Sequence, residues 1–375
     1  MNKLIFDPVV SGHHIEFLWN LIKIQYSNNI ENENKIYIVG RGFIDKSIED
    51  YGALEIDSPN HLVLEITKVE SILTNSKIIY IRHLFSFLVM LKYTLKYKSR
   101  DVLVMDLNQI LKPLMVFSSF LNFKISGILF NGNKFLALKG IKEDLTRTVL
   151  NSKVINKIFI LNGGKIPVEL NNKFDINKVK SISDPLPKID ISEIQIQKSN
   201  KVVLLYIGSV TKRKGIDIIL EGFKLINKDL SQIYQLRILG KVSEDIRTYV
   251  DSSIKIIKNK NGLDIKYNPD FITHKNFINE LINSDYVLAL YKDSEISSGI
   301  LGYSILLNKD LIGSNNGFIG SKYLKEWNGM CIKPNKNHFF KLLNLPLAKS
   351  TRKVTLNNSY MKEHSYETFY KVLNE

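Results

Sequence analysis

Residues 202–226 read VVLLYIGSVTKRKGIDIILEGFKLI, and their pattern decides the fold class of the second half of the chain. An apolar run typical of a buried strand ends at Ile207, a loop bounded by Gly208 and Gly215 follows, and the apolar spacing after the loop is that of a helix. Three consecutive cations lie in the loop: Lys212, Arg213 and Lys214. Because a helix N-terminus attracts anions, this order predicts a phosphate site; it equally fits an ordinary strand-to-helix loop with solvated lysines.

Strand-like and helix-like segments alternate along the rest of the chain. In the first half, the strand-like runs lie at 3–6, 35–39, 78–81, 102–105, 128–130 and 158–161. In the second half, they continue at 235–239, 254–257, 286–291, 311–313 and 330–334. Helical spacing is clearest at 15–24, 141–149 and 276–283. This alternation predicts parallel sheets covered on both faces, an α/β architecture of two doubly wound, Rossmann-like units.

The length of 375 residues predicts about two domains. A proline-containing polar stretch after Asp184 is typical of a linker, and the last residues place apolar side chains on one helical face. We therefore expect an N-terminal domain at 1–184, a linker at 185–200, a C-terminal domain at 201–348 and a helical tail at 349–375. Ligands of such sheets bind beyond the carboxyl ends of the strands, so we expect a site in a cleft between the domains.

The chain carries 52 Lys and Arg against 37 Asp and Glu, so its formal net charge is +15. Most of the excess is lysine, and the sequence has no arginine-rich stripe, zinc-finger spacing or aromatic RNA-binding box. Nucleic acid is therefore not the expected partner. An anionic membrane surface fits a lysine-rich protein better.

Other global features exclude several classes of protein. No apolar run reaches the roughly 18 residues that suggest a membrane span, and the N-terminus lacks the apolar stretch of a signal peptide. Cys331 is the only cysteine, which excludes an internal disulfide and a cysteine-based zinc site. We expect a cytoplasmic protein, with peripheral contact on the inner face of the cell membrane as an option.

The order of segments from about residue 200 to 345 resembles the nucleotide-sugar domain of GT-B glycosyltransferases, specifically the retaining enzymes of glycosyltransferase family 4. In that family, the glycine after the first strand lets the backbone approach the donor, and an Arg/Lys pair binds and neutralises the donor diphosphate. The resemblance gives these donor-binding and catalytic roles to Gly208, Arg213 and Lys214. The family usually has its arginine directly after the glycine, where this chain has Ser209.

A second segment of the resemblance is EISSGILGY, residues 295–303. In the family, an acidic residue and a glycine turn precede a helix that carries a second glutamate, which holds the donor ribose. The resemblance assigns donor contacts to Glu295, Ser297, Ser298, Gly299 and Ile300. This chain has Tyr303 where the second glutamate is expected, which leaves the ribose contact and the donor nucleotide open. The segment also fits a serine that caps a buried helix.

A third segment contains the glycine-rich turn 313–320. The resemblance places Gly317 near the donor, while a role in backbone geometry alone fits it equally well. The Ser-Ser-Gly-Ile-Leu form of the second segment resembles a subgroup found in bacterial surface-polysaccharide clusters.

In the N-terminal half, the loop between the first strand and the first helix would face the cleft of a GT-B enzyme. The resemblance implies that Gly12 approaches the donor, that His13 binds the acceptor and that His14 contacts the reacting sugar or the acceptor. A helix cap with solvated histidines is the alternative. No carboxylate spacing supports a metal site here, and no metal or cofactor is expected.

Two further polar residues follow strand-like runs in the N-terminal half. His83 comes after 78–81 and Asp106 after 102–105, so both are candidates for acceptor binding. Apolar clusters with nearby lysines lie at 85–93 and 111–121. Such clusters are either core or a surface that lies on a membrane.

The resemblance implies a GT-B fold whose C-terminal helix crosses back to the N-terminal domain. The N-terminal domain would bind the acceptor and the C-terminal domain the nucleotide sugar. The expected function is transfer of a sugar, with retention, to a glycan or lipid-linked glycan in bacterial polysaccharide biosynthesis. A non-catalytic glycosyltransferase-like scaffold, or another sugar-nucleotide enzyme of the same fold, remains the alternative.

Overall fold

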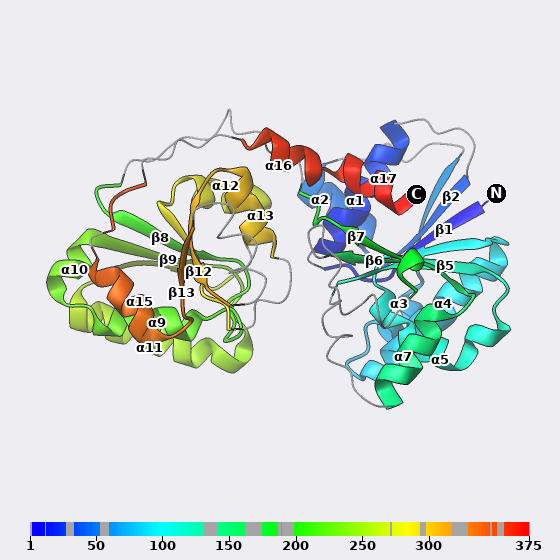
Figure 1. The fold of residues 1–375 in the computed structure, drawn as a ribbon, viewed down its shortest axis with the longest axis horizontal. Coiled ribbons are helices and arrows are strands. Elements are labelled where there is room, and N and C mark those ends of the chain that lie inside the picture. Colours follow the sequence, from blue (N-terminus) through cyan, green and yellow to red (C-terminus); the bar gives the residue numbers. More distant parts are fainter. Residues whose placement is uncertain are drawn as a thin grey trace. The chain divides into compact units, whose positions relative to one another are not determined.

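The computed structural model describes the following residues: 2–11, 13–27, 34–52, 60–130, 141–161, 175–186, 189, 199–270, 272–292, 298–316, 329–345, 347–350 and 356–374. They form two compact units. Unit 1 contains residues 1–187 and 364–375, and unit 2 contains residues 188–363 (Figure 1). Each unit has a parallel sheet with helices, which confirms the predicted α/β class.

Unit 1 contains a parallel sheet in the order β3-β2-β1-β4-β5-β6-β7. Its strands are β1 (Asn2–Asp7), β2 (Asn34–Val39), β3 (His61–Glu65), β4 (Asp101–Val104), β5 (Lys124–Leu129), β6 (Ile155–Leu161) and β7 (Val179–Ile182). Its helices are α1 (His13–Ser27), α2 (Phe43–Tyr51), α3 (Lys68–Thr74), α4 (Ile79–Lys96), α5 (Leu111–Phe117), α7 (Ile141–Asn151) and α17 (Tyr366–Asn374). Short 3-10 turns lie at η1 (Leu107–Gln109), η2 (Ser118–Phe120) and η3 (Ile176–Lys178).

The central strands of unit 1, such as β1, β4 and β5, are buried on both sides because helices cover both faces of the sheet. Leu4 and Phe6 of β1 belong to a core shared with α4, α5 and α7, whereas Ile5 belongs to the core shared with α1, α2 and α17. Successive side chains of a strand point to opposite faces, so a continuous apolar run is what a doubly covered sheet requires. Figure 1 shows the two helical layers on either side of this sheet.

Unit 2 repeats this plan with a sheet in the order β10-β9-β8-β11-β12-β13. Its strands are β8 (Val202–Ile207), β9 (Tyr234–Leu239), β10 (Asp264–Asn268), β11 (Tyr286–Ala289), β12 (Asp310–Ser314) and β13 (Met330–Ile332). Its helices are α9 (Ile216–Leu225), α10 (Lys228–Ile233), α11 (Arg247–Asn261), α12 (His274–Ile282), α13 (Gly299–Leu306), α15 (Lys336–Asn344) and α16 (Asn358–Glu363), and η4 (Glu244–Ile246) precedes α11.

Strand order reverses once in each sheet. In unit 1 the chain leaves β1 towards β2 and later returns to its other side with β4, and in unit 2 the same reversal separates β8 from β11. The loops that follow these strands run in opposite directions, which leaves a crevice at the carboxyl edge. The topology therefore singles out the loops after β1, β4, β8 and β11 as the places to look for a site.

The C-terminal helix α17 belongs to unit 1, as expected for a tail that crosses back. The ring of Phe17 in α1 lies 6.0 Å from that of Tyr366 and 5.5 Å from that of Phe369, measured between centroids. Lys35 of β2 donates a hydrogen bond of 2.9 Å to the hydroxyl of Tyr370. The helix is thus an integral part of the unit 1 core.

Two predicted strands are wrong. Residues 78–81 lie at the start of α4, and residues 254–257 lie inside α11. Short apolar runs do not distinguish a strand from a buried helical turn, and here the apolar spacing continues at helical period over the following residues. The strands β3, β7 and β10 were not predicted.

Among the described helices, none combines the length and the apolarity needed to cross a membrane.

Substitution of Gly215 tests the close packing of the loop after β8 against Leu290 in unit 2. Gly215 has φ 77°, and an added Cβ would collide with the carbonyl oxygen of Leu290. Gly262 has a similar φ of 69° but open space around it, which makes it a matched control in the same unit. We expect Gly262→Ala to lower the free energy of unfolding by about 1 kcal/mol through backbone strain alone. Gly215→Ala adds overpacking, for a total of roughly 3 kcal/mol or more.

Urea denaturation followed by circular dichroism measures both variants. Equal losses for Gly215→Ala and Gly262→Ala would show that the close approach to Leu290 is absent in solution.

Candidate functional site

The loop after β8 touches the start of α13 at the reversal point of the unit 2 sheet. Gly208 has φ 100°, and the position of an added Cβ lies 3.0 Å from Cδ1 of Ile300 and 3.7 Å from Nζ of Lys214. Three sequence-predicted donor residues are therefore adjacent in space. A side chain at position 208 would both strain the backbone and fill the gap between the ammonium group and the helix.

The segment after β11 completes this arrangement. Nζ of Lys214 lies 5.8 Å from the ring centroid of Tyr291, within the range of a cation–π contact. The hydroxyls of Tyr291 and Ser298 are 3.1 Å apart and share a hydrogen bond. The backbone N–H of Lys292 donates to the carbonyl of Arg213 at 2.9 Å. Lys214 and the start of α13 are thus linked through Tyr291, a residue that the sequence analysis missed.

Ser298 does not cap α13 with its side chain. Its carbonyl accepts the N–H groups of Leu301 and Gly302, while its hydroxyl bonds Tyr291. The alternative of a serine that caps a buried helix is thus confirmed in position, since Ser298 is the N-cap residue of the buried α13, but its hydroxyl makes no capping hydrogen bond. The first N–H groups of the helix, those of Gly299 and Ile300, point away from the helix body, as helix geometry requires.

The chemistry of this site favours an anion. Lys214 is half-buried, the neighbouring Arg213 is exposed, and α13 adds the positive end of its dipole. A partly buried cation interacts more strongly with an anion than an exposed one, because less water screens it. The arrangement can hold a group with several negatively charged oxygens.

Tyr303 lies where the family resemblance expects a ribose-binding glutamate. Its side chain is 7% exposed, and its ring meets those of His274 at 5.6 Å and Phe277 at 5.1 Å, both edge-on. These aromatic contacts pack α13 against α12. Tyr303 therefore has a structural role.

Several predicted site residues cannot be placed. Gly12, Glu295, Ser297 and Gly317 lie outside the described residues, as does the side chain of His13.

Unit 1 brings three ionisable groups to the reversal point of its own sheet. Nδ1 of His14, in the first turn of α1, lies 3.0 Å from Oδ2 of Asp7 at the end of β1. Asp106 follows β4 and accepts a hydrogen bond of 2.9 Å from the side chain of Asn108. The sequence analysis named His14 and Asp106 but missed Asp7, which orients the imidazole.

The protonation of His14 is coupled to the two carboxylates. Burial by itself lowers the pKa of His14, but the charge and hydrogen bond of Asp7 and the charge of Asp106 outweigh it, so the pKa is raised. Burial raises the pKa of Asp106, against the opposing effects of Asn108 and His14. His14 therefore holds its proton more strongly than a free imidazole does, because Asp7 and Asp106 stabilise the protonated ring.

His83 does not lie at the end of a strand, so its predicted position is wrong. It lies in α4, where burial and the nearby charges of Lys112 and Arg82 lower its pKa to about 4. The imidazole is therefore neutral at neutral pH. Among the described residues, no hydrogen bond or ion pair joins His83 to the Asp7–His14 pair.

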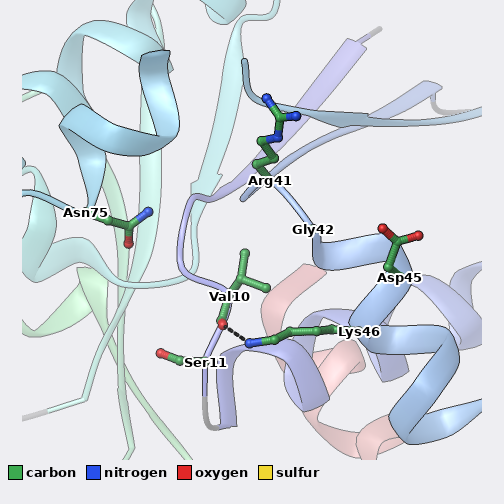
Figure 2. A pocket seen from close by; sticks show the side chains of 7 residues that line it. All are labelled: Val10, Ser11, Arg41, Gly42, Asp45, Lys46 and Asn75. Carbon is green, nitrogen blue, oxygen red and sulfur yellow. Dashed lines mark hydrogen bonds between the residues drawn. The ribbon is translucent and has the colours of Figure 1, made fainter. Parts of the chain in front are cut away.

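An open cavity of about 470 Å³ lies at the carboxyl edge of the unit 1 sheet. It is lined by Val10, Ser11, Arg41, Gly42, Asp45, Lys46 and Asn75. Figure 2 shows that the lining comes from the segments after β1 and β2, from α2 and from the end of α3, and that Nζ of Lys46 reaches the carbonyl of Val10. One signal in the sequence points to it, since Arg41 comes two residues after a strand-like run, but this signal was missed.

In the part of the chain that the structure describes, no group of three or more His, Cys, Asp or Glu side chains is arranged to hold a metal ion. The expectation that the protein needs no metal or cofactor stays a prediction.

Two units, each with a parallel sheet and helices, have the architecture of the GT-B fold. The whole chain matches HepE of Anabaena, solved in complex with UDP and glucose, over 98% of that chain with a TM-score of 0.64 and 13% identity. It also matches sucrose-phosphate synthase from Thermosynechococcus elongatus over 97% of that chain, with a TM-score of 0.67 and 11% identity. A third match is the lipopolysaccharide outer core galactosyltransferase WaaB, at a TM-score of 0.61, 11% identity and 98% of that chain.

These likenesses cover 100% of this chain and show its fold, which is the fold of glycosyltransferases. No family model and no curated protein sequence matches the chain.

Measurement of the pKa of His14 tests whether Asp7 and His14 form the pair that the structure shows. We expect this pKa to lie above the ordinary value of about 6.5. Asp7→Asn removes the charge of Asp7 while burial remains, so the pKa of His14 should then fall below that value. The stability that the protonated His14 contributes is full below the unfolded pKa and is lost as the pH rises through the raised folded pKa.

Titration of the His14 imidazole by NMR measures this shift. Asp45→Asn, which neutralises an exposed carboxylate on α2, is the control and should leave the His14 titration unchanged. An unshifted His14 in Asp7→Asn would contradict the assigned pair.

Proposed function

We propose that this protein is a glycosyltransferase that moves a sugar from a nucleotide-sugar donor to a glycan or lipid-linked glycan acceptor. The reaction would retain the anomeric configuration and serve bacterial polysaccharide biosynthesis, such as the assembly of a capsule, O-antigen or exopolysaccharide. Peripheral contact with an anionic membrane is part of the proposal, because a lipid-linked acceptor is confined to a membrane.

The observation that carries this proposal is the contact of Gly208, Lys214 and Ile300 at the reversal point of the unit 2 sheet. It combines a glycine without a side chain, a half-buried lysine and a helix N-terminus, which are features that bind a diphosphate. HepE binds UDP and UDP-glucose within the same fold, so UDP is the first donor nucleotide to test.

In the proposed reaction, the acceptor hydroxyl oxygen forms a bond to the anomeric carbon while the bond from that carbon to the donor phosphate breaks. The nucleoside diphosphate leaves with the bonding electrons, and the hydroxyl proton passes to a leaving phosphate oxygen. Lys214 and Arg213 stabilise the negative charge that develops on the diphosphate. No metal is assigned to this step.

We assign the acceptor to unit 1. His14, held by Asp7, would hydrogen-bond the transferred sugar or the acceptor. Asp106 would accept a hydrogen bond from a hydroxyl group of the acceptor. The cavity beside Arg41 has room for a sugar ring and has both donors and acceptors on its walls.

Lys214 and Lys212 form a matched pair for testing the donor site. Both are loop lysines, but Lys214 is half-buried beside Gly208, whereas Lys212 is exposed. We expect Lys214→Ala to lower kcat by roughly 10²- to 10³-fold, because a preorganised charge at the leaving group is lost. Lys212→Ala should change kcat by no more than about twofold, as exposed charges contribute little.

Sugar transfer measured with a nucleotide-sugar panel gives kcat for both variants, and thermal denaturation checks that both remain folded. Near-normal turnover in Lys214→Ala would overturn the donor-site assignment.

Isothermal calorimetry with UDP-, GDP- and dTDP-sugars separates the proposed enzyme from a non-catalytic scaffold. Affinity for at least one donor supports the enzyme, whereas no affinity for any of them favours the scaffold. Proton NMR of the product then reports the anomeric configuration, and an inverted product would overturn the proposal of retention.

A further inference from the structure

The outer side of α4 in unit 1 carries an apolar stripe. The exposed fractions of its members are 71% for Tyr80, 39% for Leu84, 41% for Leu88 and 62% for Leu95. At 3.6 residues per turn, these positions fall within an arc of roughly 80° around the helix. Phe87, by contrast, is 1% exposed and belongs to the core beneath the helix. The helix is thus apolar on two sides, and the core accounts for only one of them.

The segment after β4 that contains α5 and η2 extends this stripe. Nζ of Lys112 lies over the ring of Tyr80, 4.1 Å from its centroid, and Phe117 stacks on Phe87 at 5.5 Å. In and after α5, Val116 is 65% exposed and Phe120 is 82% exposed. We call the following exposed side chains the apolar face: Tyr80, Leu84, Leu88, Leu95, Val116 and Phe120.

The charges on the two helices that carry the apolar face are of one sign; on the neighbouring helices, Glu70 of α3 pairs with Lys92 at 2.6 Å and Asp144 of α7 pairs with Arg147 at 3.1 Å. Neither α4 nor α5 contains an Asp or Glu. Between Lys77 and Lys124, the sequence has eight Lys or Arg and two acidic residues, Asp101 and Asp106, so the difference is +6. Neither of these acidic residues is exposed.

We infer that the apolar face docks unit 1 onto an anionic lipid bilayer. This inference rests on the proposed function, in which the acceptor is lipid-linked. An exposed apolar stripe with basic residues at its borders has the composition of a helix that lies in a membrane interface. The aliphatic and aromatic side chains would enter the headgroup region while the lysines contact anionic headgroups.

Charge distinguishes this occupant from the alternatives. A second copy of the chain would bring the same basic residues against each other, so self-association through this face is opposed by repulsion. A protein partner would have to be acidic over the whole face. A leaflet that contains anionic lipid offers both an apolar interior for the exposed side chains and negative headgroups for the lysines. It needs no exact match of individual contacts, unlike a folded partner.

Co-sedimentation of the full-length protein with vesicles tests the docking. We expect binding to vesicles of phosphatidylcholine and phosphatidylglycerol, little binding to phosphatidylcholine alone, and weakening as salt is raised. The double variant Val116→Asp with Phe120→Asp places charges in the apolar face and should bind roughly tenfold more weakly or worse. Leu345→Asp is the matched control, since Leu345 is 62% exposed in unit 2, and it should bind as the unmodified protein does.

A second variant tests the electrostatic part. Lys96→Glu with Lys112→Glu should weaken binding to the phosphatidylglycerol vesicles and remove most of its salt dependence. Unchanged binding in both double variants, or no binding of the unmodified protein to anionic vesicles, would overturn the inference.

Donor affinity, measured by calorimetry on the same preparations, separates this inference from the proposed function. Donor binding without vesicle binding overturns the docking surface alone. Vesicle binding without affinity for any nucleotide sugar leaves the docking surface standing and overturns the proposed enzyme.

Discussion

The candidate donor site depends on how closely the loop after β8 approaches the segment after β11. Two positions in that loop have no side chain and a positive φ, Gly208 and Gly215. A side chain at Gly215 would collide with the carbonyl oxygen of Leu290 and would push the loop away from the segment to which the hydrogen bond from Lys292 to the carbonyl of Arg213 now joins it. The loop cations keep their place beside the start of α13 because the backbone, and not their own flexible side chains, determines it.

Features that the backbone positions could be predicted from the sequence, because the order of strands and loops already determines where they lie. The strands β1, β8 and β11 are continuous apolar runs, and the residues that follow them lie at the carboxyl edge wherever the helices pack, so Gly208 and Lys214 could be assigned from order alone. The run 78–81 was misassigned because four apolar residues fit a strand or a helical turn equally well. The stripe that continues from Tyr80 along α4 shows the helical period over a much longer span.

Other features could not be predicted, because they depend on side chains that meet only after folding. Asp7 and His14 belong to different elements, and the turn between them decides whether their side chains meet. The cavity beside Arg41 is built from segments that are far apart in the sequence. The contacts of Tyr303 with His274 and Phe277 likewise require α12 and α13 to be packed together, and no spacing rule contains that information.

The residues that give the net charge of +15 contribute differently, depending on where they lie in the structure. Lys214 is half-buried beside an aromatic ring, where one cation interacts strongly with a ligand because little water screens it. Lysines such as Lys96 and Lys112 are exposed, and at a salt concentration of about 0.1 M their fields decay over roughly 10 Å. Single exposed lysines therefore attract little. A group of them matters only against a surface that is itself densely charged, as an anionic leaflet is, and only when apolar side chains hold the two surfaces in contact.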